Sequence, residues 1–200
     1  MEIKKIVITG GPCAGKSAGF KRIKEEFGAL GYTVLFVAET ATELILGGVA
    51  PDTCKSVAEY EKMQAILQME KEKVFLKAAE GMANDKILIV CDRGTADIKA
   101  YMSEDEFSEV LKGLGKSESE LRDDYDAVFH LVTTAKGAAE YYTTENNSAR
   151  TETPEQAAEL DDRLIEVWKE HSFYRVIDNS TDFKTKIDRL IRCIKDFLKI

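Results

Sequence analysis

The chain has 200 residues, of which 44% are hydrophobic and 32% are charged. A chain of this length can bury roughly 70% of its unfolded surface, so we expect a single domain over residues 1–200 that needs neither disulfides nor a structural metal. The formal net charge of -8 excludes a general affinity for nucleic acid or for an anionic membrane surface, because both favour a basic protein.

The spacing of the cysteines and the absence of long apolar runs indicate the cellular location of the protein. Cys13, Cys54, Cys91 and Cys193 are far apart and form no C-x-x-C pair, so they predict neither a zinc site nor a disulfide framework. The sequence starts on an apolar strand pattern without a charged leader, and no apolar run approaches the roughly 18 residues of a membrane helix. We expect a cytoplasmic protein without a signal peptide or a membrane span.

The strongest motif is at residues 10–17, which spell GGPCAGKS and fit the phosphate-binding (Walker A) pattern G-x-x-x-x-G-K-[ST]. An apolar strand pattern at residues 3–9 precedes the motif, and a helical pattern from Lys16 to about residue 30 follows it. Glycines let backbone amides surround a phosphate, Lys16 neutralises its charge, and the Ser17 hydroxyl binds Mg²⁺. We expect ATP or GTP with Mg²⁺ here, held by Gly10, Gly11, Pro12, Cys13, Ala14, Gly15, Lys16, Ser17 and Ala18. Within this set, Cys13 is expected to fill space rather than to react.

A second apolar run at residues 32–38 predicts a strand, and Glu39 follows directly after it. A carboxylate at this strand end can accept the proton of an acceptor hydroxyl during phosphoryl transfer. The alternative is that Glu39 caps a helical segment at residues 40–46. The sequence is consistent with both roles.

The next helix begins at a capping box. Ser56 and Glu59 have the spacing of that motif, and the helical pattern continues to about residue 83. A helix of this length spans about 40 Å, so we expect it to form one wall of a cleft.

Asp92 and Arg93 come directly after the third predicted strand, at residues 87–91. Asp92 is placed to hold Mg²⁺ together with Ser17, because an acidic residue at this strand end can bind the ion through water. Arg93 is placed to bind a phosphate or hydroxyl of an acceptor with its planar donors. The alternatives are a helix cap at Asp92 or a structural pair between Asp92 and Arg93.

An acidic insertion follows at residues 103–126, where a break at residues 113–119 predicts two short helices around a turn. The fourth strand is predicted at residues 127–132. It contains His130, which we expect to be a hydrogen-bonded core residue, whereas His171 is expected to interact with the dipole of a nearby helix end.

The polar segment at residues 134–153 has the character of a lid. Arg150 near its end is placed to close over the phosphates as charge develops in the transition state, and the alternative is a free surface arginine. Thr153 begins the next helix as a cap. A fifth strand is predicted at residues 174–177, and a last helix covers the sheet with Phe183, Ile187, Leu190, Ile194 and Leu198.

The strand patterns are continuously apolar, which is typical of parallel strands covered on both faces, so the expected class is α/β. Ligands in such sheets bind beyond the carboxyl ends of the strands. We therefore expect the catalytic side chains to meet there, namely Lys16, Glu39, Asp92, Arg93 and Arg150. Asp97, Tyr101 and Arg163 are weaker candidates, for which a structural role is an equal alternative.

The P-loop motif with Glu39 after the second strand and Asp92-Arg93 after the third resembles the P-loop kinases of nucleosides and nucleotides. A closer similarity is to the AAA-like ATP/GTP-binding domain group that includes the TRPL translocation defect protein 14 and is similar to the kinase domain of nicotinamide riboside kinases. It covers nearly the whole chain and rests on the stretches AETATEL, CDRGTADIKAY, YDAVFHLVT, NNSARTET and VIDN.

This resemblance implies a three-layer P-loop NTPase fold with a five-stranded parallel sheet in the order 2-3-1-4-5 and helices on both faces. It also implies phosphates on the loop, Mg²⁺ near Ser17 and Asp92, and a lid arginine at the position of Arg150. Members of the group are labelled ATPases or GTP-binding proteins, and some similar proteins are linked to lipid binding, so the resemblance leaves the reaction open.

Two main functions remain from the sequence, and a third alternative is a free-standing ATPase that belongs to a larger assembly. The first is a small-molecule kinase that moves the γ-phosphoryl group of a nucleotide to a nucleoside-like hydroxyl, which the carboxylate after the second strand and the lid both favour. The second is a regulatory protein in which ATP or GTP orders the segments after strands two and three to recruit a protein or lipid partner.

Overall fold

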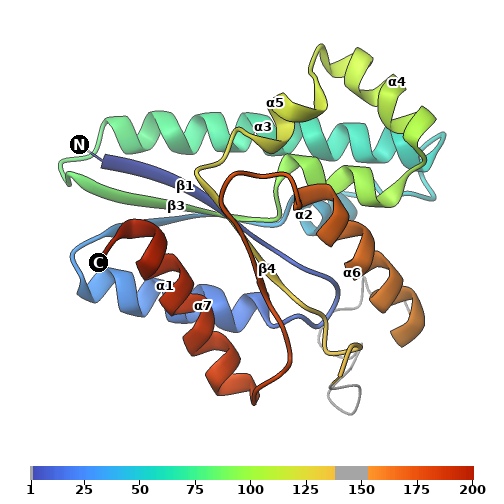
Figure 1. Cartoon of the computed structure of the whole chain (residues 1–200). Helices are drawn as coiled ribbons and strands as arrows, with labels where there is room; N and C mark the ends of the chain where they lie inside the picture. The colour runs from blue at the N-terminus through green and yellow to red at the C-terminus, as the bar shows by residue number, and fades with distance from the viewer. Residues whose placement is uncertain (1, 138–152) are drawn as a thin grey trace.

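The computed structural model describes residues 2–137 and 153–200 and contains one five-stranded sheet (Figure 1). Its strands are all parallel and have the order β2-β3-β1-β4-β5, as the family resemblance implies. They are β1 (Glu2–Thr9), β2 (Thr33–Val37), β3 (Lys86–Asp92), β4 (Ala127–Leu131) and β5 (Tyr174–Ile177). The predicted α/β class and all five predicted strands are confirmed, with ends that differ by at most one residue.

Helices connect the strands and cover both faces of the sheet (Figure 1). The described helices are α1 (Lys16–Ala29), α2 (Thr40–Leu46), α3 (Val57–Glu80), the 3₁₀ helix η1 (Thr95–Tyr101), α4 (Glu104–Leu114), α5 (Glu118–Arg122), α6 (Pro154–Trp168) and α7 (Phe183–Leu198). The predicted capping residues Ser56 and Thr153 do begin α3 and α6, each accepting a backbone N–H with its side chain. Helix α3 ends at Glu80, slightly before the predicted end, because Gly81 follows as its C-cap.

The acidic insertion forms two short helices, as predicted. Ser103 and Ser117 begin α4 and α5 with complete capping boxes. Gly115, with φ 64°, ends α4 in the left-handed conformation that glycine adopts without strain. Both helices lie over the same face of the sheet as α3, where Phe107 and Leu121 are buried in the core.

Alternate residues of the central strands enter two separate cores. Val7, Ile89 and Val128 face the core under α3 and α6, which also holds the fully buried ring of Trp168. Their neighbours Ile6, Ile8, Leu88, Val90 and Phe129 face the second core, under α1 and α7. Because both faces are covered, the strands are apolar on both sides, which explains their continuous hydrophobicity.

Phe183 departs from the expected pattern of the last helix. Ile187, Leu190 and Ile194 are buried as predicted, but Phe183 is 51% exposed. It begins α7, beyond the end of the sheet, where its ring packs beside Gly15. Phe183 therefore contacts the phosphate-binding loop rather than the core.

The parallel arrangement places the carboxyl ends of the strands at one edge. Ile8, at the end of β1, lies beside Asp92 at the end of β3, and Thr9 lies beside His130 of β4. The segments that follow these strands therefore start side by side. No helix among the described residues is long and apolar enough to span a membrane.

Gly94→Ala is predicted to destabilise the fold by about 1–3 kcal/mol, because an added methyl group overpacks the core. A Cβ at Gly94 would lie 2.7 Å from Cζ2 of Trp168 and 3.0 Å from Cγ2 of Val7. Urea unfolding followed by tryptophan fluorescence measures the loss.

Gly28→Ala is the matched control. Gly28 is inside α1, and an added Cβ there meets nothing within 4 Å. Alanine favours the helix, so this variant should gain about 0.5–1 kcal/mol. Equal effects of the two substitutions would contradict the packing described here.

Candidate functional site

The loop between β1 and α1 has the backbone that a phosphate-binding loop needs. Gly10, Cys13 and Gly15 all have positive φ angles, of 141°, 58° and 95°. A Cβ at Gly10 would lie 2.1 Å from the carbonyl oxygen of Leu131, so β4 leaves room only for glycine. This explains two of the fixed glycines in the motif.

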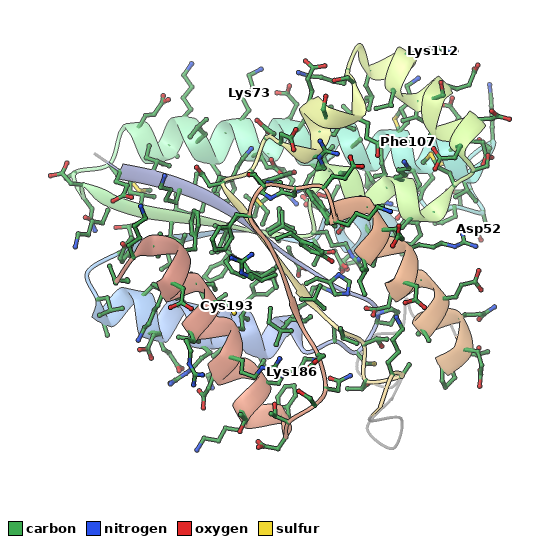
Figure 2. The ribbon with its side chains drawn as sticks, viewed as in Figure 1. Asp52, Lys73, Phe107, Lys112, Lys186 and Cys193 are labelled. Carbon is green, nitrogen blue, oxygen red and sulfur yellow. The ribbon has the colours of Figure 1, made fainter. Side chains whose placement is uncertain are left out.

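Three buried side chains hold the loop from below. Asp161 of α6 accepts a hydrogen bond from the Gly11 amide at 2.9 Å. Thr133, just after β4, donates its hydroxyl to the Pro12 carbonyl. Lys186 of α7 donates to the Ala14 carbonyl at 3.1 Å (Figure 2). Neighbouring elements thus satisfy polar groups of residues 11, 12 and 14.

Asp161 also joins the loop to the end of β4. Its Oδ1 accepts from the Thr133 amide at 3.1 Å and lies 3.0 Å from His130 Nε2. Its Oδ2 accepts from Lys136 Nζ at 3.1 Å. These hydrogen bonds hold the pKa of Asp161 below its usual range against the opposing effect of burial. His130 is therefore a core residue, as expected, but it is hydrogen-bonded only through Nε2, and its buried Nδ1 has no partner in the described part of the chain.

Lys16 and Ser17 occupy the first turn of α1. Lys16 is largely buried, and its charge lowers the pKa of two carboxylates, those of Glu39 and Asp92. Ser17 is exposed on the same turn. The loop lysine therefore shares one electrostatic environment with the acidic residues that follow β2 and β3.

Asp92, at the end of β3, has a buried carboxylate oxygen that lacks a protein partner. Its Oδ1 makes no hydrogen bond to any residue in the described ranges 2–137 and 153–200. Burial raises the pKa of Asp92 to about 6, although Lys16 opposes the shift. An unpartnered, buried carboxylate oxygen beside a phosphate-binding loop has the hard-oxygen chemistry that Mg²⁺ prefers, so the residues present fit this ion.

Glu39 pairs with Arg93, not with the backbone of α2. Arg93 Nε donates to Glu39 Oε1 at 3.0 Å, and the Thr42 hydroxyl donates to Oε2 at 2.6 Å. Burial raises the pKa of Glu39, but Arg93, Lys16 and Thr42 outweigh it and lower the pKa to about 2. The Glu39 side chain makes no capping hydrogen bond to α2, and the ion pair of Arg93 is with Glu39 rather than Asp92, so these two sequence alternatives are wrong.

Asp97 supports Arg93 from the opposite side. Arg93 adopts a left-handed backbone with φ 71°, a conformation that costs non-glycine residues about 1–3 kcal/mol and is typical of functional sites. Its Nη1 lies 3.9 Å from Asp97 Oδ2. Asp97 is itself buried and accepts hydrogen bonds from the Thr9 hydroxyl and from Trp168 Nε1.

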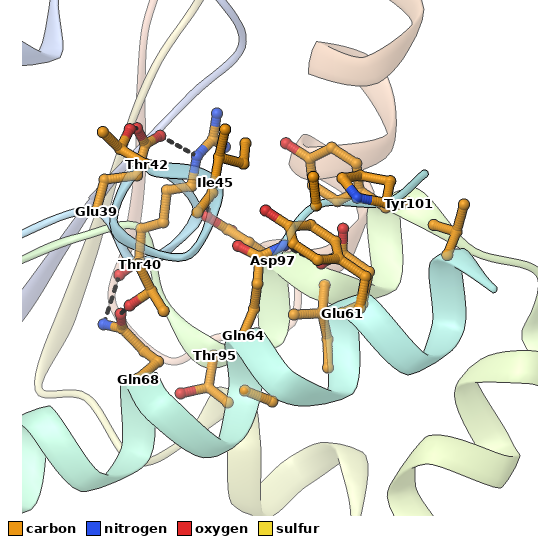
Figure 3. A pocket seen from close by; sticks show the side chains of 18 of the residues that line it. Glu39, Thr40, Thr42, Ile45, Glu61, Gln64, Gln68, Thr95, Asp97 and Tyr101 are labelled. Atoms are coloured by element: carbon orange, nitrogen blue, oxygen red, sulfur yellow. Dashed lines mark hydrogen bonds and ion pairs between the residues drawn. The ribbon is translucent and has the colours of Figure 1, made fainter. Parts of the chain in front are cut away.

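A cavity of about 620 Å³ opens beside the loop, between α2, α3 and η1 (Figure 3). Pro12 of the loop lines it, and so do the candidates Glu39, Asp92, Arg93, Asp97 and Tyr101. Helix α3 forms one wall, as predicted, with Tyr60, Glu61, Gln64 and Gln68. All four candidates at and after the end of β3 thus meet Glu39 around one pocket.

Glu61 is a pocket residue that sequence analysis missed. It is 3% exposed and accepts a hydrogen bond from Gln64 Nε2 at 2.7 Å. Burial raises the pKa of Glu61 to about 8, so the carboxyl group is protonated at neutral pH. On the same wall, the buried Tyr60 hydroxyl has no hydrogen-bond partner in the described part of the chain. Their helical spacing with Gln64, Ala65 and Gln68 was the available signal for both.

Two other residues discussed in the sequence analysis lie away from this pocket. Arg163 is exposed and pairs with Glu159 of its own helix at 2.7 Å. His171 is buried three residues after the end of α6, and its Nε2 hydrogen-bonds the Tyr125 carbonyl at 3.0 Å; its interaction with the helix dipole stays a prediction. Arg150 and most of the predicted lid at residues 134–153 lie outside the described residues.

A family model described as an AAA domain matches residues 5–186, and the chain belongs to this family. No curated protein sequence matches it. Among solved structures, it is similar to deoxyadenosine kinase from M. mycoides with bound dATP, at a TM-score of 0.63 and 20% identity over 96% of this chain and 99% of that one.

Two other structures of that kinase give the same picture. The structure with the products dCMP and a flexible dCDP has a TM-score of 0.65 at 19% identity, and the one with bound dCTP has 0.60 at 18% identity. Each match again covers 96% of this chain and 99% of the other. At such low identity the similarity establishes the shared fold.

The two carboxylates beside Arg93 should change stability in opposite directions. The pKa of Asp92 is raised from 3.8 to about 6, so ionising Asp92 costs the folded protein stability above that pH. Asp92→Asn should therefore raise the free energy of unfolding at pH 8, by about 1–3 kcal/mol, and the gain should shrink towards zero near pH 4. Urea unfolding of the nucleotide-free protein measures it.

Glu39→Gln is the matching variant, and we expect it to lower the free energy of unfolding where Asp92→Asn raises it. The pKa of Glu39 is lowered from 4.5 to about 2, so the ionised carboxylate stabilises the fold above pH 4.5, and this contribution is lost as the pH falls towards 2. The variant should lose about 1–3 kcal/mol at pH 8, because Arg93 stays buried without its partner. Destabilisation of similar size by both variants at pH 8 would contradict the assigned environments.

Proposed function

We propose that this member of the AAA domain family is a Mg²⁺-dependent kinase that transfers the γ-phosphoryl group of ATP or GTP to a hydroxyl of a small nucleoside-like acceptor. The observation that carries the proposal is the cavity of about 620 Å³ beside the phosphate-binding loop, with the charged side chains of Glu39, Asp92 and Arg93 in its lining. A regulatory NTPase needs the loop but has no need of a second, acceptor-sized pocket next to it.

In this proposal the loop amides and Lys16 bind the phosphates, and Ser17 and Asp92 hold Mg²⁺. The ion, when bound, neutralises charge on the transferring phosphoryl group. Arg93 is held in the pocket lining by Glu39 and Asp97, where its guanidinium can donate to the acceptor or the phosphoryl group. Arg150 is proposed to close the site from the lid.

The structure refines the proposed role of Glu39. With a pKa of about 2, it is a weak base while Arg93 remains bound to it. It can still accept a hydrogen bond from the acceptor hydroxyl and orient it for in-line attack. Since the transition state of phosphoryl transfer is loose, positioning and charge stabilisation contribute more than a strong base. Glu39 is therefore proposed to orient the hydroxyl, and it gains basicity only when Arg93 turns towards phosphate.

The charges of the pocket favour an acceptor without a phosphate group. Besides the protonated Glu61, four acidic side chains line it, namely Glu39, Asp52, Asp92 and Asp97, whereas Arg93 is already paired. A nucleoside monophosphate would place a second anion against these carboxylates, which costs free energy. Hydroxyl and amide donors of a nucleoside suit them, and protonated Glu61 can donate to an acceptor carbonyl.

The finer family position and location are also proposals. The stretches shared with the TRPL translocation defect protein 14 group and with nicotinamide riboside kinases support a place near them. One domain over residues 1–200 is supported by a family match across residues 5–186. A cytoplasmic location is supported by Cys54, Cys91 and Cys193, which form no disulfide in the described part of the chain, because reducing compartments keep thiols in this state.

The proposal is tested by ADP and GDP release from ATP or GTP with Mg²⁺, across nucleosides, including nicotinamide riboside, and their monophosphates. One or more nucleosides should raise turnover well above the rate without acceptor, and the monophosphates should not. Lys16→Ala should lower the stimulated rate by about 10²-fold or more, because the transferring phosphate loses its cation.

Circular dichroism checks that Lys16→Ala is folded, and Lys195→Ala, in α7 and paired with Glu26 of α1, serves as the matched lysine control. Unchanged turnover in folded Lys16→Ala would refute a role for the loop. Tight nucleotide binding with no stimulation by any acceptor would favour the regulatory alternative with a protein or lipid partner.

A further inference from the structure

Lys186 is a buried ammonium beneath the phosphate-binding loop. It lies in the first turns of α7 and is 2% exposed (Figure 2). Its Nζ donates to the Ala14 carbonyl at 3.1 Å, the Val132 carbonyl at 2.6 Å and Asn179 Oδ1 at 2.7 Å. These contacts use all three hydrogens of the ammonium group.

The three acceptors are neutral, so they satisfy the hydrogens without cancelling the charge. Lys186 forms no ion pair with any residue in the described ranges, although burying an unpaired ammonium is costly. The charged groups that face it are Asp161 of α6, Asp178 before α7, and Arg189 of α7. Those two carboxylates already bind other cations, Lys136 and Arg189.

The Ala14 carbonyl connects this charge to the ligand side of the loop. The same peptide group carries the Gly15 N–H, which points away from the carbonyl because the peptide is planar and trans. A cation on the carbonyl polarises the peptide and makes the opposite N–H a stronger donor. The charge of Lys186 would therefore stabilise an anion bound by the loop amides in two ways, by polarising the peptide group and by direct electrostatic attraction.

We propose that Lys186 is a positioning residue for nucleotide, whose buried charge supports the phosphates from beneath the loop through the Ala14–Gly15 peptide, so that bound phosphate is its missing counter-charge. The inference rests on the proposed binding of nucleotide at this loop. It assigns a second lysine, distant in sequence and shielded from solvent, to the phosphate site.

A pH dependence of nucleotide affinity follows. Burial lowers the pKa of Lys186 to about 8, against the opposing effects of Asp161 and Asp178. A bound anion favours the charged form and raises this pKa again towards its ordinary value. Nucleotide affinity therefore depends on the ammonium proton of Lys186, which the nucleotide-free protein loses above pH 8. The affinity should fall about tenfold between pH 7 and pH 9.

The experiment measures the Kd of Mg-ADP by calorimetry at pH 7, 8 and 9 for the wild type, Lys186→Met and Lys195→Met. Lys195 is on the same helix but pairs with Glu26 at 2.6 Å near the surface, so its variant is the matched control. We expect Lys186→Met to weaken binding about tenfold at pH 7 and to lose the pH dependence, while Lys195→Met follows the wild type. Parallel pH profiles for the wild type and Lys186→Met would overturn the inference.

Lys186→Met leaves three acceptors without a donor, so its fold is checked by thermal unfolding. NMR titration of wild-type protein with labelled lysine side chains gives an answer that needs no variant. One lysine should titrate near pH 8 and shift upward by a unit or more with ADP, and an unchanged titration would overturn the inference. If ADP binding also survives Lys16→Ala, the proposed function fails; if it requires Lys16 but ignores Lys186 and pH, only this inference fails.

Discussion

The phosphate-binding loop must leave amides available for an anion while its remaining polar groups are satisfied from within the protein. Asp161, Thr133 and Lys186 meet this constraint by binding Gly11, Pro12 and Ala14 from beneath. They come from α6, the end of β4 and α7, so the loop keeps its shape only when the second half of the chain has folded around it. The site is thus a product of the whole sheet rather than of the motif alone.

The same parallel sheet sets the division of roles among the acidic residues. Glu39 and Asp92 end neighbouring strands, yet an arginine partner lowers the pKa of one and burial raises the pKa of the other. Asp92 has a buried carboxylate oxygen without a partner in the described part of the chain, whereas Glu39 is paired with Arg93, which has a left-handed backbone and lies beside Asp97. In the proposed function, metal binding and acceptor orientation are therefore assigned to the ends of two neighbouring strands, next to one pocket.

The sequence predicted what depends on local pattern and on sheet topology. The loop motif, the strands and the meeting of Glu39, Asp92 and Arg93 at one edge all follow from short stretches and from the geometry of parallel strands. The sequence did not predict which side chains form hydrogen bonds with each other, because the partners are far apart in the chain. Arg93 and Glu39 are separated by 54 positions, and Lys186 and Ala14 by 172. Asp161 and Lys186 did leave a signal, since each is a charge on the apolar stripe of its helix, between Ala157 and Leu164 or between Phe183 and Leu190.

The central claim is that the γ-phosphoryl group passes to an organic hydroxyl held in the pocket beside the loop. Following the label from γ-³²P-ATP or γ-³²P-GTP into products, with Mg²⁺ and a mixture of nucleosides, tests this transfer directly. The account predicts that label accumulates in a phosphate ester of one nucleoside class, faster than it appears as inorganic phosphate. Label found solely as inorganic phosphate with every acceptor would contradict it.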